Sequence, residues 1–136
     1  AGRILHEALA AVGRPYICAD IAWCGLSIHH LDTAGKLELM KAIRGATDRF
    51  LMIYEPSRRD GEDRDSFITR FLDVHKPLWT MLSEAEWEGL AHHISTADLP
   101  ETSSGWLDLG RQAGFAEAKL LFVDPTDCLR IFRYDA

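Results

Sequence analysis

The sequence predicts an α/β fold in which a parallel pair of strands precedes a C-terminal antiparallel hairpin. Residues 21–26 and 50–54 are continuous apolar runs, which is typical of strands buried on both faces. A helical pattern over residues 33–45 lies between them, so the three form a β-α-β unit with a right-handed crossover. Residues 118–123 and 129–134 are apolar stretches separated by a short Asp-Pro-Thr-Asp turn, which favours an antiparallel hairpin.

The first half of the chain carries several signals for where elements begin and end. Residues 2–12 are expected to form a short helix that ends before Pro15. Asp32 or Thr33 can cap the helix that ends near Gly45. Pro56 is expected to end the second strand, since proline has no backbone N–H to pair.

Three further helices are expected between that strand and the hairpin. Apolar residues recur with helical period over 67–82, and Pro77 should break or kink this helix. Ser83 and Glu86 have the spacing of a capping box for the next one. Ser103 or Ser104 can cap the N-terminus of the last helix, and Gly114 suits the left-handed conformation at its C-terminus.

Composition indicates one globular domain and argues against several classes of partner. The chain has 136 residues, 47% of them hydrophobic and 26% charged, and a net charge of -6, so it lacks the basic surface of a nucleic-acid binder. Its three cysteines lack the C-x-x-C spacing of a zinc knuckle, and reduced thiols are expected. Without an apolar run of roughly 18–20 residues, no membrane contact is expected, and the expected location is cytoplasmic.

Three segments together resemble the second half of class I, Rossmann-like methyltransferases that use S-adenosyl-L-methionine (SAM). Residues 20–31 (DIAWCGLSIHHL) look like the family's fourth strand, which often opens with aspartate and ends in a histidine-leucine turn. Residues 50–56 (FLMIYEP) look like its fifth strand, and residues 106–115 (WLDLGRQAGF) like the helix before its sixth. The resemblance implies a partial methyltransferase sheet over residues 20–136, preceded by a helix and connector in residues 1–19.

The same resemblance implies methyl transfer from SAM to a small molecule. The family grips SAM with a glycine-rich loop after its first strand and an acidic residue after its second, and no G-x-G-x-G segment is present here. The chain is therefore expected to be a fragment or a diverged form. The 136 residues alone are expected to bind SAM weakly or not at all and to be inactive.

The candidate site residues cluster where the two parallel strands end, which is where such sheets bind ligands. By resemblance, the backbone of Cys24, Gly25 and Leu26 lies along the methionine part of SAM. His29 and His30 follow, and one of them could act as general base. The structural alternative is that one histidine caps the turn and the other packs against the next helix.

Two more residues are candidates for substrate binding. Glu55 ends the second parallel strand, where it either orients the substrate, anchors a helix N-terminus or pairs with Arg58. Arg58 could hold an acidic substrate or lie in a solvated loop. No metal is expected, because the neighbours His92 and His93 diverge by about 100° on a helix and no H-E-x-x-H spacing is present.

Other functions stay open from sequence alone. A non-catalytic methyltransferase-like module that binds a partner protein is the main alternative, and a nucleotide-dependent Rossmann-like enzyme is another. The strand at residues 21–26 would lie mid-sheet in the family, and it carries none of the charges or prolines that protect a natural edge. If that edge is open, either residues 2–18 fold back over it or a second chain pairs with it, and the homodimer is the favoured expectation.

Overall fold

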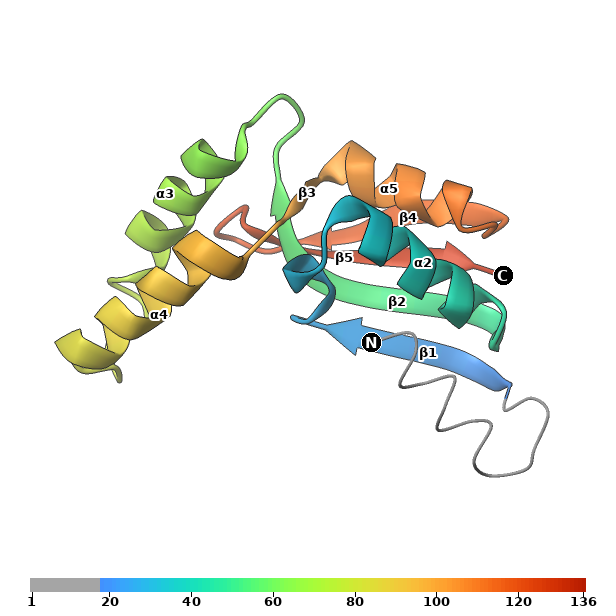
Figure 1. Cartoon of the computed structure of the whole chain (residues 1–136), viewed down its shortest axis with the longest axis horizontal. Coiled ribbons are helices and arrows are strands. Elements are labelled where there is room, and N and C mark those ends of the chain that lie inside the picture. Colours follow the sequence, from blue (N-terminus) through green and yellow to red (C-terminus); the bar gives the residue numbers. More distant parts are fainter. Residues whose placement is uncertain (1–17) are drawn as a thin grey trace.

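A computed structural model of the protein describes residues 18–136 and confirms the predicted α/β class. Strands β1 (Ala19–Gly25) and β2 (Thr47–Arg58) are adjacent and parallel, and β4 (Glu117–Val123) and β5 (Leu129–Asp135) form an antiparallel hairpin. Because β5 pairs antiparallel with β2, the sheet has the order β1-β2-β5-β4 (Figure 1). The predicted parallel pair and closing hairpin are therefore confirmed.

Two helices, α2 (Thr33–Arg44) and α5 (Ser103–Gln112), cover one face of this sheet (Figure 1). The Asp32 side chain caps α2 by accepting a hydrogen bond from the Gly35 N–H at 2.7 Å. The main core lies between these helices and the sheet, and its fully buried members are Ile28, Met40, Leu51, Ile53, Trp106, Phe132 and Tyr134. The described residues place no helix on the opposite face of the sheet.

The contact between α5 and the sheet depends on a glycine. Gly110 is buried in α5, and a Cβ atom there would lie 2.1 Å from the Tyr134 ring. The Tyr134 hydroxyl donates to the Trp106 carbonyl at 3.1 Å, which fixes the ring beneath the helix. Only glycine permits this close approach.

Helices α3 (Arg64–His75) and α4 (Glu84–Ala97) form a pair that projects from one end of the sheet (Figure 1). The helix α3 ends before Pro77, and α4 begins with the predicted capping box of Ser83 and Glu86. A second, smaller core holds the pair against the β4–β5 turn, and its buried members are Phe67, Ile68, Phe71, Ile94 and Cys128.

The prediction that Pro56 ends the second strand is wrong, because β2 runs on to Arg58. Pro56 pairs with Leu129 of β5, and the Ser57 N–H donates to the Cys128 carbonyl at 2.9 Å. Backbone groups alternate in direction along a strand, so the nitrogen of Pro56 points toward the β1 side. There β1 has already ended, at the pair of Gly25 with Tyr54, so the missing N–H interrupts no pairing.

The start of α5 differs from the sequence expectation, and its end agrees with it. Thr102, rather than Ser103 or Ser104, caps α5, since its hydroxyl accepts from the Gly105 N–H at 3.0 Å. Thr102 also belongs to β3 (Glu101–Thr102), a short strand parallel to β2 that the sequence did not predict. Gly114 has φ of 92°, which confirms the left-handed end of α5.

The helix expected over residues 2–12 lies outside the described residues. Within residues 18–136, every helix is too short or too polar to cross a membrane.

Candidate functional site

A 3₁₀ turn, η1 (Ile28–His30), follows β1 and carries both predicted histidines. Between the strand and the turn, Leu26 has φ of 51°, a left-handed conformation that is uncommon for a residue other than glycine. Its N–H still donates to the Tyr54 carbonyl of β2 at 2.8 Å. The turn therefore lies where the two parallel strands end, which is the ligand-binding edge of such sheets.

Glu55 is fully buried and holds this turn in place. Its Oε1 accepts hydrogen bonds from the backbone N–H groups of Ser27 and Ile28, each at 3.0 Å, and its Oε2 accepts one from the His29 N–H at 3.3 Å. A fourth contact joins Oε2 to His29 Nδ1 at 2.6 Å. Glu55 thus anchors the N-terminus of a helical turn, which is one of the roles the sequence left open. Arg58 does not pair with Glu55 and binds other groups.

The same contact defines the state of the His29 ring. Glu55 already accepts from three N–H groups through both oxygens, so we assign the hydrogen on the 2.6 Å contact to His29 Nδ1. In the neutral ring, Nε2 then carries a lone pair. That atom lies 3.7 Å from Asp98 Oδ1, and the His29 side chain is only 6% exposed.

Asp98, just after α4, is a site residue that sequence reasoning missed. Several contacts hold the segment 98–101 beside η1. The Leu99 N–H donates to the His29 carbonyl at 2.8 Å, and Arg64 Nε donates to the Asp98 carbonyl at 2.8 Å. The buried Lys36 ammonium donates to the Leu99 carbonyl and to Glu101 Oε1. No sequence signal marks Asp98, because an aspartate after a helix is ordinary.

His30 is the more open of the two histidines, with 40% of its side chain exposed. Its Nδ1 lies 3.3 Å from the same Asp98 Oδ1. Its ring contacts His29, with centroids 4.1 Å apart, and meets the His93 ring of α4 edge-on at 5.3 Å. The structure therefore brings His29, His30 and Asp98 together, with His30 on the solvent side.

The predicted cofactor segment adjoins this cluster. Gly25 and Leu26 are exposed, and Cys24 is half-buried. The nearest atoms that a Cβ at Gly25 would meet belong to the Trp23 side chain, the first at 3.2 Å, and Gly25 itself is exposed. Burial raises the pKa of the Cys24 thiol, and the Glu55 carboxylate raises it further, so the neutral thiol dominates at neutral pH.

Arg58 does not join the histidines. Its Nε donates to the Pro100 carbonyl at 2.9 Å and its Nη1 to the Glu62 carbonyl at 2.7 Å. The side chain lines a hollow of about 220 Å³ whose other walls include Lys36, Arg64 and Pro100. Two backbone carbonyls thus accept two of the guanidinium's hydrogen bonds, and the Arg58 side chain lines a polar hollow rather than the histidine cluster.

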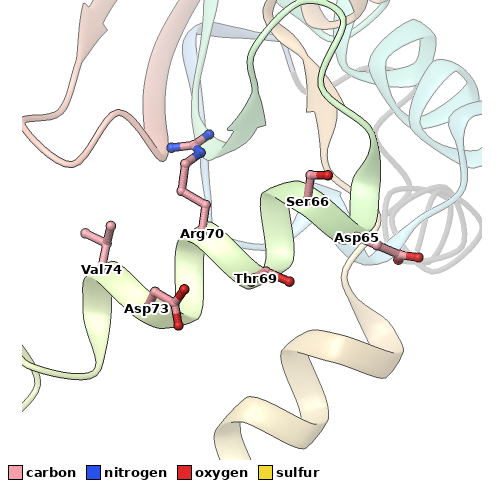
Figure 2. Close-up of a pocket in the computed structure, with 6 residues that line it drawn as sticks. All are labelled: Asp65, Ser66, Thr69, Arg70, Asp73 and Val74. Carbon is pink, nitrogen blue, oxygen red and sulfur yellow. The ribbon is translucent and has the colours of Figure 1, made fainter.

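A second hollow, shown in Figure 2, follows the outer surface of α3. Its six lining residues all come from this one helix: Asp65, Ser66, Thr69, Arg70, Asp73 and Val74. Arg70 points away toward Glu62, to which it donates two hydrogen bonds at 2.8 Å. A groove on a single helix, away from the strand ends, has none of the features of a cofactor site.

Comparison with solved structures identifies the architecture. The chain matches PigF with bound S-adenosyl-homocysteine (SAH) at a TM-score of 0.59 and 15% identity, over 99% of this chain and 40% of that one. It matches LepI in complex with SAM at 0.55 and 12% identity, over 90% of this chain and 27% of LepI. The chain shares its fold with part of these SAH- and SAM-bound proteins and of SAM-dependent methyltransferases. No protein-family model and no curated protein matches the sequence.

A third match widens the comparison and defines its extent. Magnesium protoporphyrin IX methyltransferase from Synechocystis, with SAH bound, matches at a TM-score of 0.51 and 14% identity, over 87% of this chain and 45% of the enzyme. The chain thus spans less than half the length of each of these proteins. The methyltransferase-like resemblance expected from the sequence is confirmed at the level of the fold.

Proposed function

We propose that the chain forms the substrate-facing part of a SAM-dependent methyltransferase that acts on a small molecule. The observation that carries this proposal is the position of His29, His30 and Asp98 at the end of β1 and β2, directly after the accessible backbone of Gly25. Structural neighbours with this fold bind SAM or SAH. In that class of reaction, the cofactor supplies a methyl group on a sulfonium for displacement by a nucleophile held in line.

Cys24, Gly25 and Leu26 are the residues that would hold one side of the cofactor. Their backbone is exposed at the ligand-binding edge, and the absence of a Cβ at Gly25 leaves room for a close approach. The side chain of Cys24 takes no part in the chemistry, because its thiol stays protonated. The backbone of these three residues would therefore contact one side of the cofactor, and residues outside this chain would contact the other side.

His30 is the candidate general base and His29 the residue that positions it. His30 is partly exposed and lies 3.3 Å from the Asp98 carboxylate, which can stabilise the imidazolium formed when the ring takes a proton from the nucleophile. His29 is buried and held by Glu55, so it cannot reach a substrate. Arg58, at the rim of its polar hollow, is the candidate group for an acidic part of the substrate.

Calorimetric titration tests the cofactor half of this proposal. SAH and ATP are titrated into the 136-residue chain and into the longest polypeptide that contains it. We expect SAH to bind the longer protein with micromolar affinity and the 136 residues weakly, and ATP to bind neither. A Gly25→Val variant should lose SAH binding, while Gly89→Ala, at a helical glycine with open space around it, should retain it.

Methyl-transfer kinetics test the role of His30. With a substrate in hand, His30→Asn should lower kcat by about 10²–10⁴-fold and leave KM for SAM unchanged. His92→Asn changes an exposed histidine of α4 and serves as the matched control. Unchanged kcat in His30→Asn would remove the base from the proposal. SAH binding with no methyl transfer would instead support the non-catalytic module.

The exposed edge of β1 supports a second proposal, that the chain assembles as a homodimer. Among residues 18–136, β1 pairs on one side only, and Ile21 and Trp23 are 50% and 56% exposed. An unpaired apolar strand is a template for another strand. Light scattering at tens of micromolar protein, on the order of usual assay concentrations, should give twice the mass of one chain, and a single-chain mass would contradict this proposal.

A further inference from the structure

The cluster of His29, His30 and Asp98 holds a buried carboxylate oxygen that its protein contacts within residues 18–136 leave without a hydrogen-bond donor. Asp98 Oδ1 is buried and has no hydrogen-bond partner in the described part of the chain. It nevertheless lies 3.7 Å from His29 Nε2 and 3.3 Å from His30 Nδ1. A buried carboxylate oxygen without a donor is costly, so its retention needs a physical reason.

His29 does not supply the missing donor in this arrangement. Glu55 fixes the His29 hydrogen on Nδ1, so the Nε2 lone pair faces the carboxylate oxygen, and 3.7 Å is too long for a hydrogen bond even in the imidazolium form. His30 Nδ1 is closer but makes no hydrogen bond to Asp98 Oδ1 in the observed geometry. When His30 Nδ1 is unprotonated, three electron-pair donors converge on one small volume.

We propose that His29 Nε2, His30 Nδ1 and Asp98 Oδ1 bind a divalent transition-metal cation of the zinc class. The three atoms all lie within 4.8 Å of one another. Ligands placed at about 2.0–2.2 Å around a tetrahedral cation are separated by roughly 3.3–3.6 Å, close to the two separations from Asp98. Two imidazole nitrogens and one carboxylate oxygen form a donor set that suits zinc, cobalt or ferrous iron.

The surroundings of the three donors resemble those of a prepared metal site. A metal-binding histidine commonly donates its other ring N–H to a carboxylate, which fixes the tautomer and the ring orientation. Glu55 does this for His29 at 2.6 Å. Asp98 is held through its backbone by Arg64 and by the neighbouring bond between Leu99 and His29. The donors are thus in place before a cation arrives, with its remaining positions open on the His30 side.

This inference goes beyond the proposed methyl transfer and does not depend on it. A cation on His30 Nδ1 leaves the ring hydrogen on Nε2, so the cation-bound form has no free nitrogen to accept a proton. Cation binding and the base role of His30 therefore exclude each other in one molecule. Zinc should inhibit methyl transfer reversibly, with recovery on chelation, if both proposals hold.

The test is calorimetric titration of Zn²⁺ into the 136-residue chain after treatment with a chelator, without SAM or substrate. We expect one equivalent to bind, and Asp98→Asn and His30→Asn each to weaken the affinity at least about tenfold. Thermal unfolding provides a second readout: saturating Zn²⁺ should raise the Tm of the wild type more than that of either variant.

His92→Asn is the matched control, since it removes an exposed histidine next to His93 on α4 and leaves the three donors intact. Its Zn²⁺ affinity should equal that of the wild type. Three outcomes would overturn the site: no stoichiometric binding to the wild type, undiminished binding to Asp98→Asn, or a loss confined to His92→Asn. Because the readouts need neither SAM nor a substrate, these outcomes are separate from a failure of the proposed function.

Discussion

Two buried carboxylates flank the same turn, and their surroundings are opposite. Glu55, at the end of β2, accepts three backbone N–H groups and contacts the His29 ring. Asp98, after α4, presents one buried oxygen that accepts no hydrogen bond within the described residues. The imidazole of His29 lies between them, at 2.6 Å from one and 3.7 Å from the other.

This difference indicates that Glu55 stabilises the structure of the turn, whereas Asp98 is available to bind a ligand. A carboxylate with all its acceptor positions occupied stabilises the fold and has little capacity left for a ligand. A buried carboxylate without donors lowers stability and gains from any cation that reaches it. We therefore assign Glu55 to the framework of the turn and Asp98 to its function, and substitutions at these and related positions test that assignment.

Glu55→Gln is expected to have the largest effect on stability. The amide nitrogen of glutamine would face backbone N–H groups that now donate to a carboxylate, leaving buried donors without acceptors. We expect the free energy of unfolding to fall by about 3–5 kcal/mol, measured by urea denaturation. A loss under about 1 kcal/mol would show that the turn does not depend on Glu55.

Trp87→Ala tests how much the packing between α3 and α4, which positions Asp98, contributes to stability. Trp87 is 7% exposed on α4, and its ring packs edge-on against Trp79 at 6.1 Å. The cavity left by alanine should lower the free energy of unfolding by about 3–5 kcal/mol. A denaturation midpoint that hardly moves would mean that this aromatic face lines an open pocket and that α4 holds Asp98 loosely.

Glu62 is a third carboxylate whose oxygens accept hydrogen bonds, and its substitution is expected to lower stability less than Glu55→Gln does. Its two hydrogen bonds from Arg70, with further help from the Arg59 N–H, hold its pKa below the ordinary value of 4.5. Glu62→Gln should cost about 1–3 kcal/mol at pH 7. Since the folded-state pKa is lowered, this contribution is complete above the ordinary pKa and is lost as the pH falls through the folded-state value.

Urea midpoints of the wild type and Glu62→Gln at pH 7 and pH 3 check this pH dependence. The difference between the two proteins should shrink at the lower pH. A difference that stays constant would show that the charge of Glu62 contributes nothing to stability.

The sequence predicted the sheet because its signals are local. The apolar runs that became β1 and β2, and the short turn between β4 and β5, determine direction and pairing with little help from distant residues. The strand past Pro56 was missed for a tertiary reason: the proline is tolerated only because β1 ends two residues earlier in the register. Whether β2 can continue past Pro56 depends on where β1 ends, and no local sequence pattern predicts that position.

The site was predictable only in part. Gly25, His29 and Glu55 could be placed near one another because the carboxyl ends of neighbouring parallel strands meet at one edge. Asp98 could not, since it lies 43 residues after Glu55 in the chain, and its approach to η1 depends on tertiary contacts such as the bond from the Leu99 N–H to the His29 carbonyl. The role of Glu55 also required the structure, because its three N–H partners belong to a turn whose shape the sequence does not specify.

The most direct test of the contrast between Glu55 and Asp98 is the unfolding free energy of Asp98→Asn in the presence of a chelator. Asparagine removes the buried charge, and its amide nitrogen can face the lone pair of His29 Nε2 without like-charge repulsion. We predict that this variant is as stable as the wild type or more stable by about 1 kcal/mol, in contrast to the loss expected for Glu55→Gln. A loss of more than about 2 kcal/mol would show that Asp98 supports the fold as Glu55 does, and would contradict its assignment to function.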